Sequence, residues 1–216
     1  MANIILHIYY HFVITKDGNT DPFNTWKMSS ARDLRWKMLS SKYVYQDRWF
    51  KARADSCRFP DGRIIEPYYV VELPDWCNTI VVTKEERVIL VRQYRYAADQ
   101  TTFELPGGVI EKDEVPMDAA KREMEEETGY TSDEIEFLLK VSPNPAINDN
   151  TAYFFLAKNA VPTAVTNPDV FEDIDIISFS KEEIWQLLSE NKMQHGVQVG
   201  PMYAAFVKLG WLQYQE

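Results

Sequence analysis

The stretch Gly108-Val-Ile-Glu-Lys-Asp-Glu114-Val-Pro-Met-Asp-Ala-Ala-Lys-Arg122-Glu123-Met-Glu125-Glu126-Glu127-Thr-Gly129-Tyr130 decides the fold, and it ends with four carboxylates within five residues. Glu123, Glu126 and Glu127 stand at i, i+3 and i+4, so a helix places them on one face, where like charges repel. Hard oxygen ligands on a rigid element suit Mg²⁺ or Mn²⁺. The stretch therefore predicts a cation-binding helix, and the alternative is an acidic face that only contacts solvent.

The spacing resembles the Nudix box, G-x5-E-x7-R-E-U-x-E-E-x-G-U, in which U is a bulky apolar residue. The matching positions are Gly108, Glu114, Arg122, Glu123, Met124, Glu126, Glu127 and Gly129. Tyr130 departs from the pattern, although its ring can still pack where an aliphatic residue is usual. The resemblance covers roughly residues 74–215 and implies an α/β (α+β) fold, an α/β/α sandwich with a mixed sheet. A small antiparallel β-sheet is expected before it.

The same resemblance implies a divalent metal site. Glu123, Glu126 and Glu127 are expected to bind Mg²⁺ or Mn²⁺ together with the backbone carbonyl of Gly107, and Glu126 and Glu127 are also candidate catalytic residues. A diphosphate repels an attacking water, and divalent cations neutralise that charge and lower the pKa of bound water. Glu125, at a variable position, is expected to face solvent. Arg122 and Glu114 are expected to pair and brace the loop.

Two segments outside the box resemble ADP-ribose pyrophosphatase-type members of the family. They are Val91-Arg92-Gln93-Tyr94-Arg95 and Phe103-Glu104-Leu105-Pro106-Gly107-Gly108. The resemblance implies that Arg95 contacts a substrate phosphate or the terminal ribose and that Glu104 lines the same cleft. Arginine suits bidentate phosphate contacts. Arg92 is a second candidate, and its alternative is a solvated strand residue.

The loop after the box both matches and departs from that subgroup. Pro145 lies 16 residues beyond Gly129, close to the spacing of a subgroup marker. Asn150 stands where a catalytic glutamate would be expected, and an amide cannot accept a proton at neutral pH. Asp149, or Glu172 with Asp173 from another loop, are the alternatives for the catalytic base. The polar loop residues can also simply form a turn.

Composition limits the partners. The chain has 216 residues, 45% hydrophobic and 13% aromatic, and a net charge of −10. This charge argues against nucleic acid and anionic membrane surfaces as partners. Two cysteines, Cys57 and Cys77, give no disulfide framework and favour a cytoplasmic location. The apolar run 4–14 is too short to span a bilayer and is expected to be a strand.

We expect three segments along the chain. Residues 1–41 form an N-terminal extension, with a loop at 15–29 and a short helix capped by Ser30 and running to about Leu39. Residues 42–73 form the small antiparallel sheet, with a hairpin turn at 59–63. The resemblance implies that this sheet mediates a homodimer and supplies aromatic stacking. The candidate stackers are Trp49, Phe50, Tyr43 and Tyr45. An aromatic side chain flanked by Arg48 and Lys51, as Trp49 is, would suit a nucleotide base, and the alternative is a core or interface role.

Residues 74–216 form the Nudix domain. Its strands are expected at 78–83, 88–93, 101–105, 135–141, 152–157 and 174–179. The box helix should begin near Pro116 and end at Gly129. A capping box of Ser180 and Glu183 predicts a helix to about Ser189, and a last helix is expected from Pro201 to about Leu209. The three histidines, His7, His11 and His195, are interpreted as structural.

These observations favour a metal-dependent hydrolase that cleaves the diphosphate of a nucleoside diphosphate linked to a sugar-like small molecule, with ADP-ribose as the first substrate. Other nucleoside diphosphate sugars, dinucleoside polyphosphates and NADH are alternatives within the same enzyme class. A non-catalytic Nudix module that senses a nucleotide sugar is the alternative from another class. The departure at Asn150 favours the sensor, whereas the complete set of box glutamates opposes it.

Overall fold

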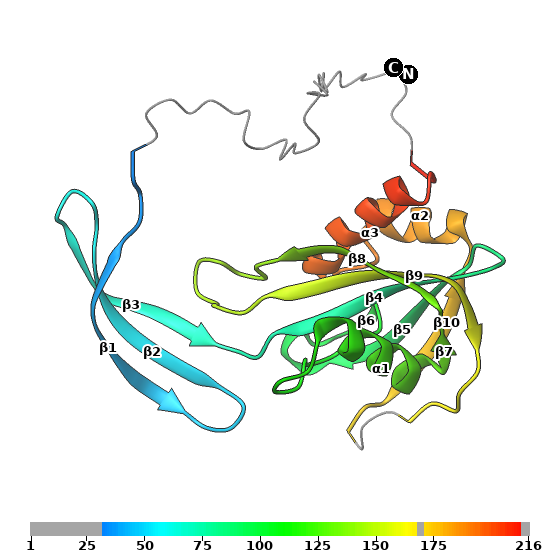
Figure 1. Cartoon of the computed structure of the whole chain (residues 1–216), viewed down its shortest axis with the longest axis horizontal. Coiled ribbons are helices and arrows are strands. Elements are labelled where there is room, and N and C mark those ends of the chain that lie inside the picture. The colour runs from blue at the N-terminus through cyan, green and yellow to red at the C-terminus, as the bar shows by residue number, and fades with distance from the viewer. Residues whose placement is uncertain (1–31, 168–170, 213–216) are drawn as a thin grey trace.

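The chain folds around two β-sheets of different size. Residues 32–167 and 171–212 are described by a computed structural model (Figure 1). The smaller sheet has the order β1-β2-β3, with all pairs antiparallel. Its strands are β1 (Lys37–Gln46), β2 (Lys51–Arg58) and β3 (Ile64–Glu72). The predicted hairpin turn between β2 and β3 is confirmed, since Phe59 N–H donates to Arg63 O at 2.9 Å and Gly62 N–H to Phe59 O at 3.0 Å.

The helix expected before this sheet is wrong over its described part. Residues 32–36 have no regular structure, and β1 begins at Lys37 and pairs with β2 from Lys37↔Arg58 to Gln46↔Lys51. Ser30 and the expected strand at 4–14 lie outside the described residues. A local capping signal contributes little when a long antiparallel partner is available, because tertiary pairing overrides propensity.

The larger sheet is mixed and has seven strands, in the order β10-β5-β4-β9-β7, with β6 also paired to β5 and β8 to β9. The strands are β4 (Trp76–Thr83), β5 (Val88–Arg95), β6 (Gln100–Glu104), β7 (Tyr130–Thr131), β8 (Glu134–Val141), β9 (Ala152–Pro162) and β10 (Ile174–Phe179). A 3-10 turn, Tyr96–Ala98, joins β5 to β6. β4 and β9 are parallel, and their continuous apolar runs are buried on both faces.

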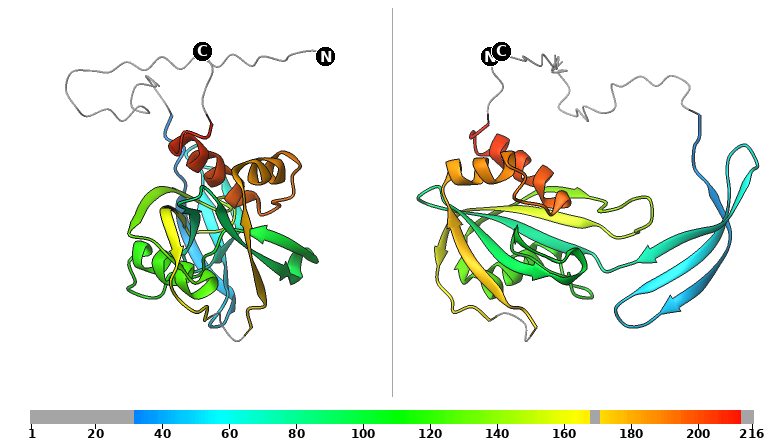
Figure 2. Two further views of the ribbon diagram at one scale, coloured as in Figure 1. Left: turned by 90° about the vertical axis from the view of Figure 1, so that its right-hand side faces the viewer. Right: turned by 180° about the vertical axis from the view of Figure 1, so that it is seen from behind.

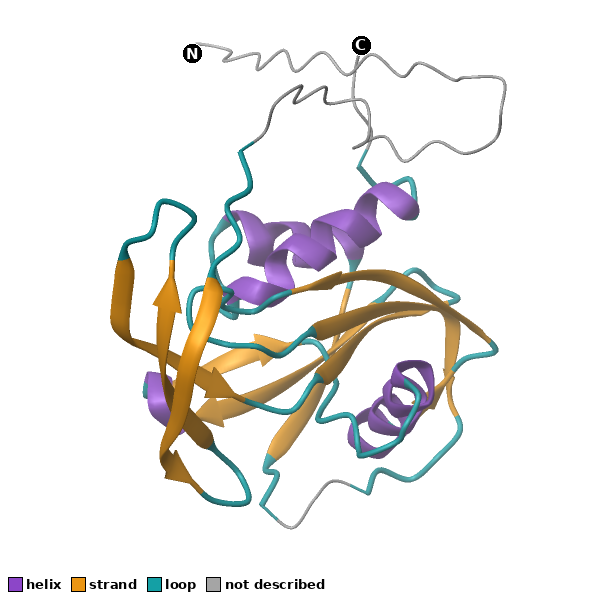
Figure 3. Cartoon of the chain, turned by 60° about the vertical axis from the view of Figure 1, so that its left-hand side comes forward, coloured by secondary structure: helices purple, strands orange, loops and turns teal. Residues whose placement is uncertain are grey.

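Helices cover both faces of this sheet, which confirms the expected three-layer sandwich (Figures 2 and 3). α1 (Pro116–Thr128) packs Met124 and Ala120 against one face. α2 (Lys181–Ser189) and α3 (Gly196–Lys208) pack Ile184 and Phe206 against the other. Alternation along β4 separates the two cores: Ile80 faces the α2–α3 layer and Val81 the α1 layer.

The local sequence predicted the ends of α1 and α2 correctly, but not the start of α3. α1 begins at Pro116 and ends before Gly129, whose φ of 70° is left-handed, as expected. Ser180 and Glu183 form the predicted capping box of α2. The predicted start of α3 at Pro201 is wrong, because α3 begins five residues earlier at Gly196 and Pro201 lies inside it, buried. Burial of this apolar segment against the sheet outweighs the preference of proline for the first turn.

The small sheet is joined to the large one by backbone contacts at the end of β3 (Figure 1). Val71 N–H donates to Ile147 O at 2.7 Å, and Asp149 N–H to Val71 O at 3.4 Å. The Tyr68 hydroxyl donates to Ala146 O. The loop that precedes β9 therefore touches both sheets. None of the helices in the described part of the chain is long and apolar enough to cross a membrane.

Candidate active site

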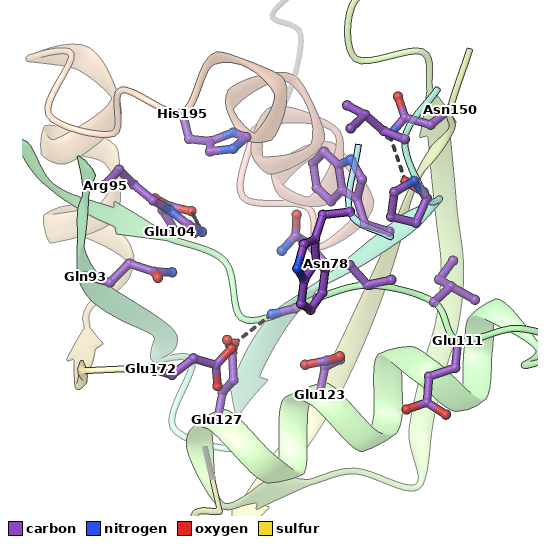
Figure 4. Close-up of a pocket in the computed structure, with 18 of the residues that line it drawn as sticks. Asn78, Gln93, Arg95, Glu104, Glu111, Glu123, Glu127, Asn150, Glu172 and His195 are labelled. Carbon is purple, nitrogen blue, oxygen red and sulfur yellow. Dashed lines mark hydrogen bonds and ion pairs between the residues drawn. The ribbon is translucent and has the colours of Figure 1, made fainter. Parts of the chain in front are cut away.

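A cleft of about 1370 Å³ lies where the two sheets, α1 and the start of α3 meet. Figure 4 shows its two opposing sides. Glu123 and Glu127 come from α1 on one side, and Arg95, Glu104 and His195 lie on the other. The turn between β1 and β2 adds further lining residues. The cleft thus joins an acidic helix face to a wall of mixed charge.

The three box glutamates lie on the cleft side of α1. Glu127 is buried at 3% exposure, and the side chains of Glu123 and Glu126 are 12% and 38% exposed. Burial raises the pKa of Glu127 to about 8, although the Gly107 N–H that donates to its Oε2 at 2.8 Å opposes the shift. Burial also raises the pKa of Glu123, and Arg122 opposes it. Uncompensated carboxylates are costly to bury, so the protein alone only partly stabilises these charges.

Two glycines allow the backbone to approach these carboxylates. Gly107 has a φ of 153°, and a Cβ there would lie 2.0 Å from Cys77 O and 2.5 Å from Asn78 Nδ2. A Cβ on Gly108 would lie 2.5 Å from Glu123 Oε1. The Gly107 N–H donates to Glu127 Oε2 at 2.8 Å, and the contact of the Gly107 carbonyl with a metal ion stays a prediction. Only glycine leaves room for both approaches.

Arg122 braces the box as expected and also contacts the carboxylates. Its guanidinium makes two bonds to Glu114, both at 3.0 Å, which fasten the loop before α1. The same side chain donates to Glu123 at 2.8 Å and to Glu126 at 3.1 Å. These charged hydrogen bonds raise its pKa. Glu125 is exposed and Tyr130 packs against the α1 core, both as expected.

The donor set fits a hard divalent cation. Carboxylate oxygens on a rigid helix are the ligands that Mg²⁺ and Mn²⁺ prefer, and the Gly108 approach keeps the space beside Glu123 free of side-chain carbon. No three His, Cys, Asp or Glu side chains of the described residues already converge on one point as a metal site would require. Instead, the Arg122 guanidinium forms ion pairs with Glu123 and Glu126. Glu123, Glu126 and Glu127 would hold the cation, as a proposal developed below.

Arg95 and Glu104 form the opposite wall. Glu104 is 1% exposed and accepts two hydrogen bonds from Arg95, at 2.8 and 2.7 Å. Burial raises the pKa of Glu104, but the bonds from Arg95 and Thr102 outweigh it and hold the pKa below its ordinary value. Arg95 is half exposed at the cleft. The pair therefore presents a fixed guanidinium edge to any ligand in the cleft.

Of the two other predicted substrate-binding residues, Trp49 lines the cleft and Arg92 does not. Arg92 pairs across the strands with Asp175 at 2.6 Å, about half exposed, and is absent from the described lining of the cleft. Alternation along β5 explains this, since Gln93 and Arg95 share the cleft face. Trp49 lines the cleft at 71% exposure, and the Arg48 guanidinium lies 4.4 Å from its ring centroid. The alternative interpretation of Arg92 as a solvated strand residue matches its contacts.

The loop candidates for a catalytic base separate in space. Asp149 lies at the junction of the sheets, 3.6 Å from Arg53, and does not appear in the described cleft lining. Glu172 lines the cleft and helps to raise the pKa of Glu127 through its charge (Figure 4). Asn150 is 4% exposed, and its Nδ2 donates to Pro74 O at 3.0 Å. Glu172 is therefore the candidate that faces the box glutamates.

The sequence analysis missed several residues that line the cleft. Asn78 and Gln198 are buried at 3% and 2% and are hydrogen-bonded to each other. His195, interpreted above as structural, lines the cleft with its ring 6.0 Å from that of Trp76. Isolated amides and a single histidine carry no spacing signal. Only the fold brings residues more than a hundred positions apart into contact.

Comparison with known proteins agrees with this geometry. The NUDIX domain model matches residues 77–198, and the model described as nucleoside diphosphate sugar hydrolase N-terminal domain matches residues 36–71. The first match covers more than half of the chain, so the chain belongs to the Nudix family. It is a Nudix pyrophosphohydrolase.

Individual relatives are more distant. A methanol dehydrogenase activator of Bacillus methanolicus is 27% identical over 83% of this chain and 94% of its own length. The ADP-ribose pyrophosphatase of Bacillus subtilis (strain 168) is 25% identical over 75% of this chain and 88% of its own. A crystal structure of an ADP compounds hydrolase superposes with a TM-score of 0.72 at 19% identity, covering 84% of this chain and all of that one. This last likeness shows the fold alone.

Proposed function

We propose that this chain hydrolyses the diphosphate linkage of a nucleoside diphosphate joined to a sugar-like moiety, with ADP-ribose as the first substrate. Water attacks one phosphorus, a P–O bond of the diphosphate breaks, and the products are AMP and a sugar phosphate. The observation that carries the proposal is the cleft itself. It sets three glutamates of α1 across from the Arg95–Glu104 pair.

The α1 wall supplies the metal site of this proposal. Glu123, Glu126 and Glu127 would hold Mg²⁺ or Mn²⁺, with Gly107 setting the orientation of Glu127. Such a cation neutralises the diphosphate and lowers the pKa of a water that it binds. Because the whole chain carries a charge of −10, an anionic substrate needs this local compensation.

The remaining roles belong to the other walls. Arg95, already oriented by Glu104, would bind a phosphate or the ribose with its free edge. Glu172 would accept the proton from the attacking water, since it faces the box glutamates. Trp49 would stack on the base, because its exposed ring lies in the cleft lining. Arg92 and Asp149 take no part in the reaction in this proposal.

The proposal includes a homodimer formed through the small sheet. All ten residues of β1 are exposed, among them Tyr43, Val44 and Tyr45. A surface of this kind is typical of an interaction site. Light scattering from the purified protein tests this part, and a mass equal to one chain at micromolar concentration contradicts it.

A substrate screen tests the function. Nucleoside diphosphate sugars, ADP-ribose, dinucleoside polyphosphates and NADH are incubated with Mg²⁺ or Mn²⁺ and a phosphatase that acts only on the monoester products. We expect turnover of ADP-ribose by the native chain and a loss of more than about 100-fold in Glu126→Gln, since even outer-shell partners of metals contribute 10–100-fold. Glu125→Gln, an exposed neighbour on the same helix, is the matched control and should keep native rates.

The screen also separates the alternatives. Tight binding of a nucleotide sugar without turnover of any compound would support the sensor and reject the enzyme. Preferred turnover of NADH or a dinucleoside polyphosphate would keep the reaction class and replace the substrate. Native rates in Glu126→Gln would reject the assignment of the metal site.

A further inference from the structure

A chain of buried hydrogen bonds runs from α3 through the large sheet to the turn that contacts Glu127. Gln198 lies in the first turn of α3 and its Oε1 accepts from Leu105 N–H at 2.8 Å. Its Nε2 donates to Asn78 Oδ1 at 3.3 Å. Asn78 Nδ2 in turn donates to Leu105 O at 2.9 Å and to Pro106 O at 3.3 Å. The two amides thus hold both polar groups of Leu105 and the carbonyl that follows it.

This series of hydrogen bonds ends at the box helix. Gly107 follows Pro106 directly, and its N–H donates to Glu127 Oε2 at 2.8 Å. A Cβ on Gly107 would lie 2.5 Å from Asn78 Nδ2, so the turn rests directly on the Asn78 amide. Figure 4 places Asn78 between the wall that carries Glu104 and the helix that carries Glu127. Cys77 N–H donates to Gly108 O and Thr79 N–H to Pro106 O, both at 2.9 Å, and the amide adds to these bonds in holding the turn whose Gly107 N–H points at Glu127.

Every polar atom of the two side chains has a partner, although both residues are almost fully buried. Buried polar networks cost stability when incomplete and fix geometry when complete. Apolar side chains at these two cleft-lining positions would remove the partners that the amides give to Leu105 N–H, Leu105 O and Pro106 O. Placement of the turn is the gain that accounts for two amides in this core.

We propose that Gln198 and Asn78 are positioning residues, which hold the 105–107 turn so that Gly107 orients Glu127 for metal binding. The inference rests on the proposed function, because it assigns Glu127 to the metal. It adds that α3, which carries none of the proposed metal ligands, controls the metal site. Neither residue contacts the reacting atoms in this proposal.

The test compares Gln198→Met with Met202→Ala in the full chain. Gln198→Met keeps the bulk and removes both bonds. Met202→Ala removes a fully buried apolar side chain from the same helix and leaves the hydrogen bonds of Gln198 and Asn78 to the turn in place. Three quantities are measured: Mn²⁺ affinity from the free-ion electron paramagnetic resonance signal, kcat and KM for the substrate found in the screen, and the melting temperature.

We expect Gln198→Met to weaken Mn²⁺ binding and lower kcat by about 10–100-fold each, as outer-shell changes do, with KM within about 3-fold. Met202→Ala should lower the melting temperature at least as much, while Mn²⁺ affinity and kcat stay near native values below that temperature. Equal loss of Mn²⁺ affinity in both variants, or native Mn²⁺ affinity in Gln198→Met, overturns the inference.

Two further variants, Asn78→Ser and Glu127→Gln, keep the result decisive. Asn78→Ser removes the bonds from Asn78 Nδ2 to Leu105 O and Pro106 O and the bond to Gln198, and it takes the place of Gln198→Met if that variant does not fold. A native chain that binds Mn²⁺ but hydrolyses nothing refutes the proposed function and leaves the positioning role testable by Mn²⁺ affinity. Native Mn²⁺ affinity in Glu127→Gln refutes the metal site itself.

Discussion

The box stretch 108–130 and the small sheet 37–72 differ in where their contacts lie. In the box, Arg122 binds Glu114, Glu123 and Glu126, all within the same stretch, and Gly108 packs on Glu123. In the small sheet, β1 leaves all its residues exposed. A region whose ion pairs join residues close together in the chain can be interpreted from local sequence. A region that leaves apolar side chains in solvent depends on whatever packs against it.

The largest effect expected from this comparison concerns the catalytic base. Glu172 faces the box, whereas Asp149 belongs to the junction with the small sheet through Arg53. We expect Glu172→Gln to lower kcat by about 100-fold or more, the usual contribution of a general base. Asp149→Asn should stay within about 3-fold. Steady-state rates at saturating Mg²⁺ measure both, and the reverse order would place the chemistry at the junction.

A smaller effect is expected at the tip of the small sheet. Trp49→Ala should raise KM for a nucleotide substrate by about 3–10-fold with kcat unchanged, because loss of an aromatic contact costs about 0.5–1.5 kcal/mol. Trp36→Ala serves as the control, since Trp36 packs on Phe59 and Tyr68, away from the cleft lining. A fall in kcat alone in Trp49→Ala would mean that the sheet takes part in the chemistry.

The smallest effect on activity is expected at the attachment of the small sheet, where the predicted change is in stability. Arg53 bridges Glu72 and Asp149 and also donates to the buried Asp55 at 3.0 Å, and its hydrogen bond holds the pKa of Glu72 below the ordinary value of 4.5. A lowered carboxylate pKa stabilises the fold above the ordinary pKa, and this stabilisation disappears as pH falls through the folded value. We expect Arg53→Gln to lower the melting temperature by at least about 4 °C at pH 7, because Asp55, which is 4% exposed, also loses its bond from Arg53.

The pH dependence provides the check on that pair. The difference in melting temperature between Arg53→Gln and the native chain should close as pH falls below 4.5. Arg63→Gln, which breaks an exposed pair with Asp61, is the control and should change little at either pH. A gap that stays constant with pH would mean that packing of the Arg53 stem, and not its charge, attaches the sheet.

The sequence predicted the box helix and its limits because the signals are local. Pro116, Gly129 and the Ser180–Glu183 capping box act on backbone groups within one turn, and the structure confirms all three. The errors occurred where a distant partner decided the outcome. Pairing with β2 makes residues 37–39 a strand. Burial against the large sheet lets α3 begin at Gly196, five residues before Pro201.

The sequence by itself determined the family through the box motif, and the layered fold followed from that resemblance. It also determined the helix that carries the three box glutamates, because spacing along one helix fixes which side chains share a face. Only the tertiary structure decided which other residues meet them. Strand alternation moved Arg92 out of the cleft and kept Arg95 in it. The packing of α3 brought Gln198 to Asn78, and loop placement favoured Glu172 over Asp149. These contacts join segments far apart in the chain, and no local pattern specifies them.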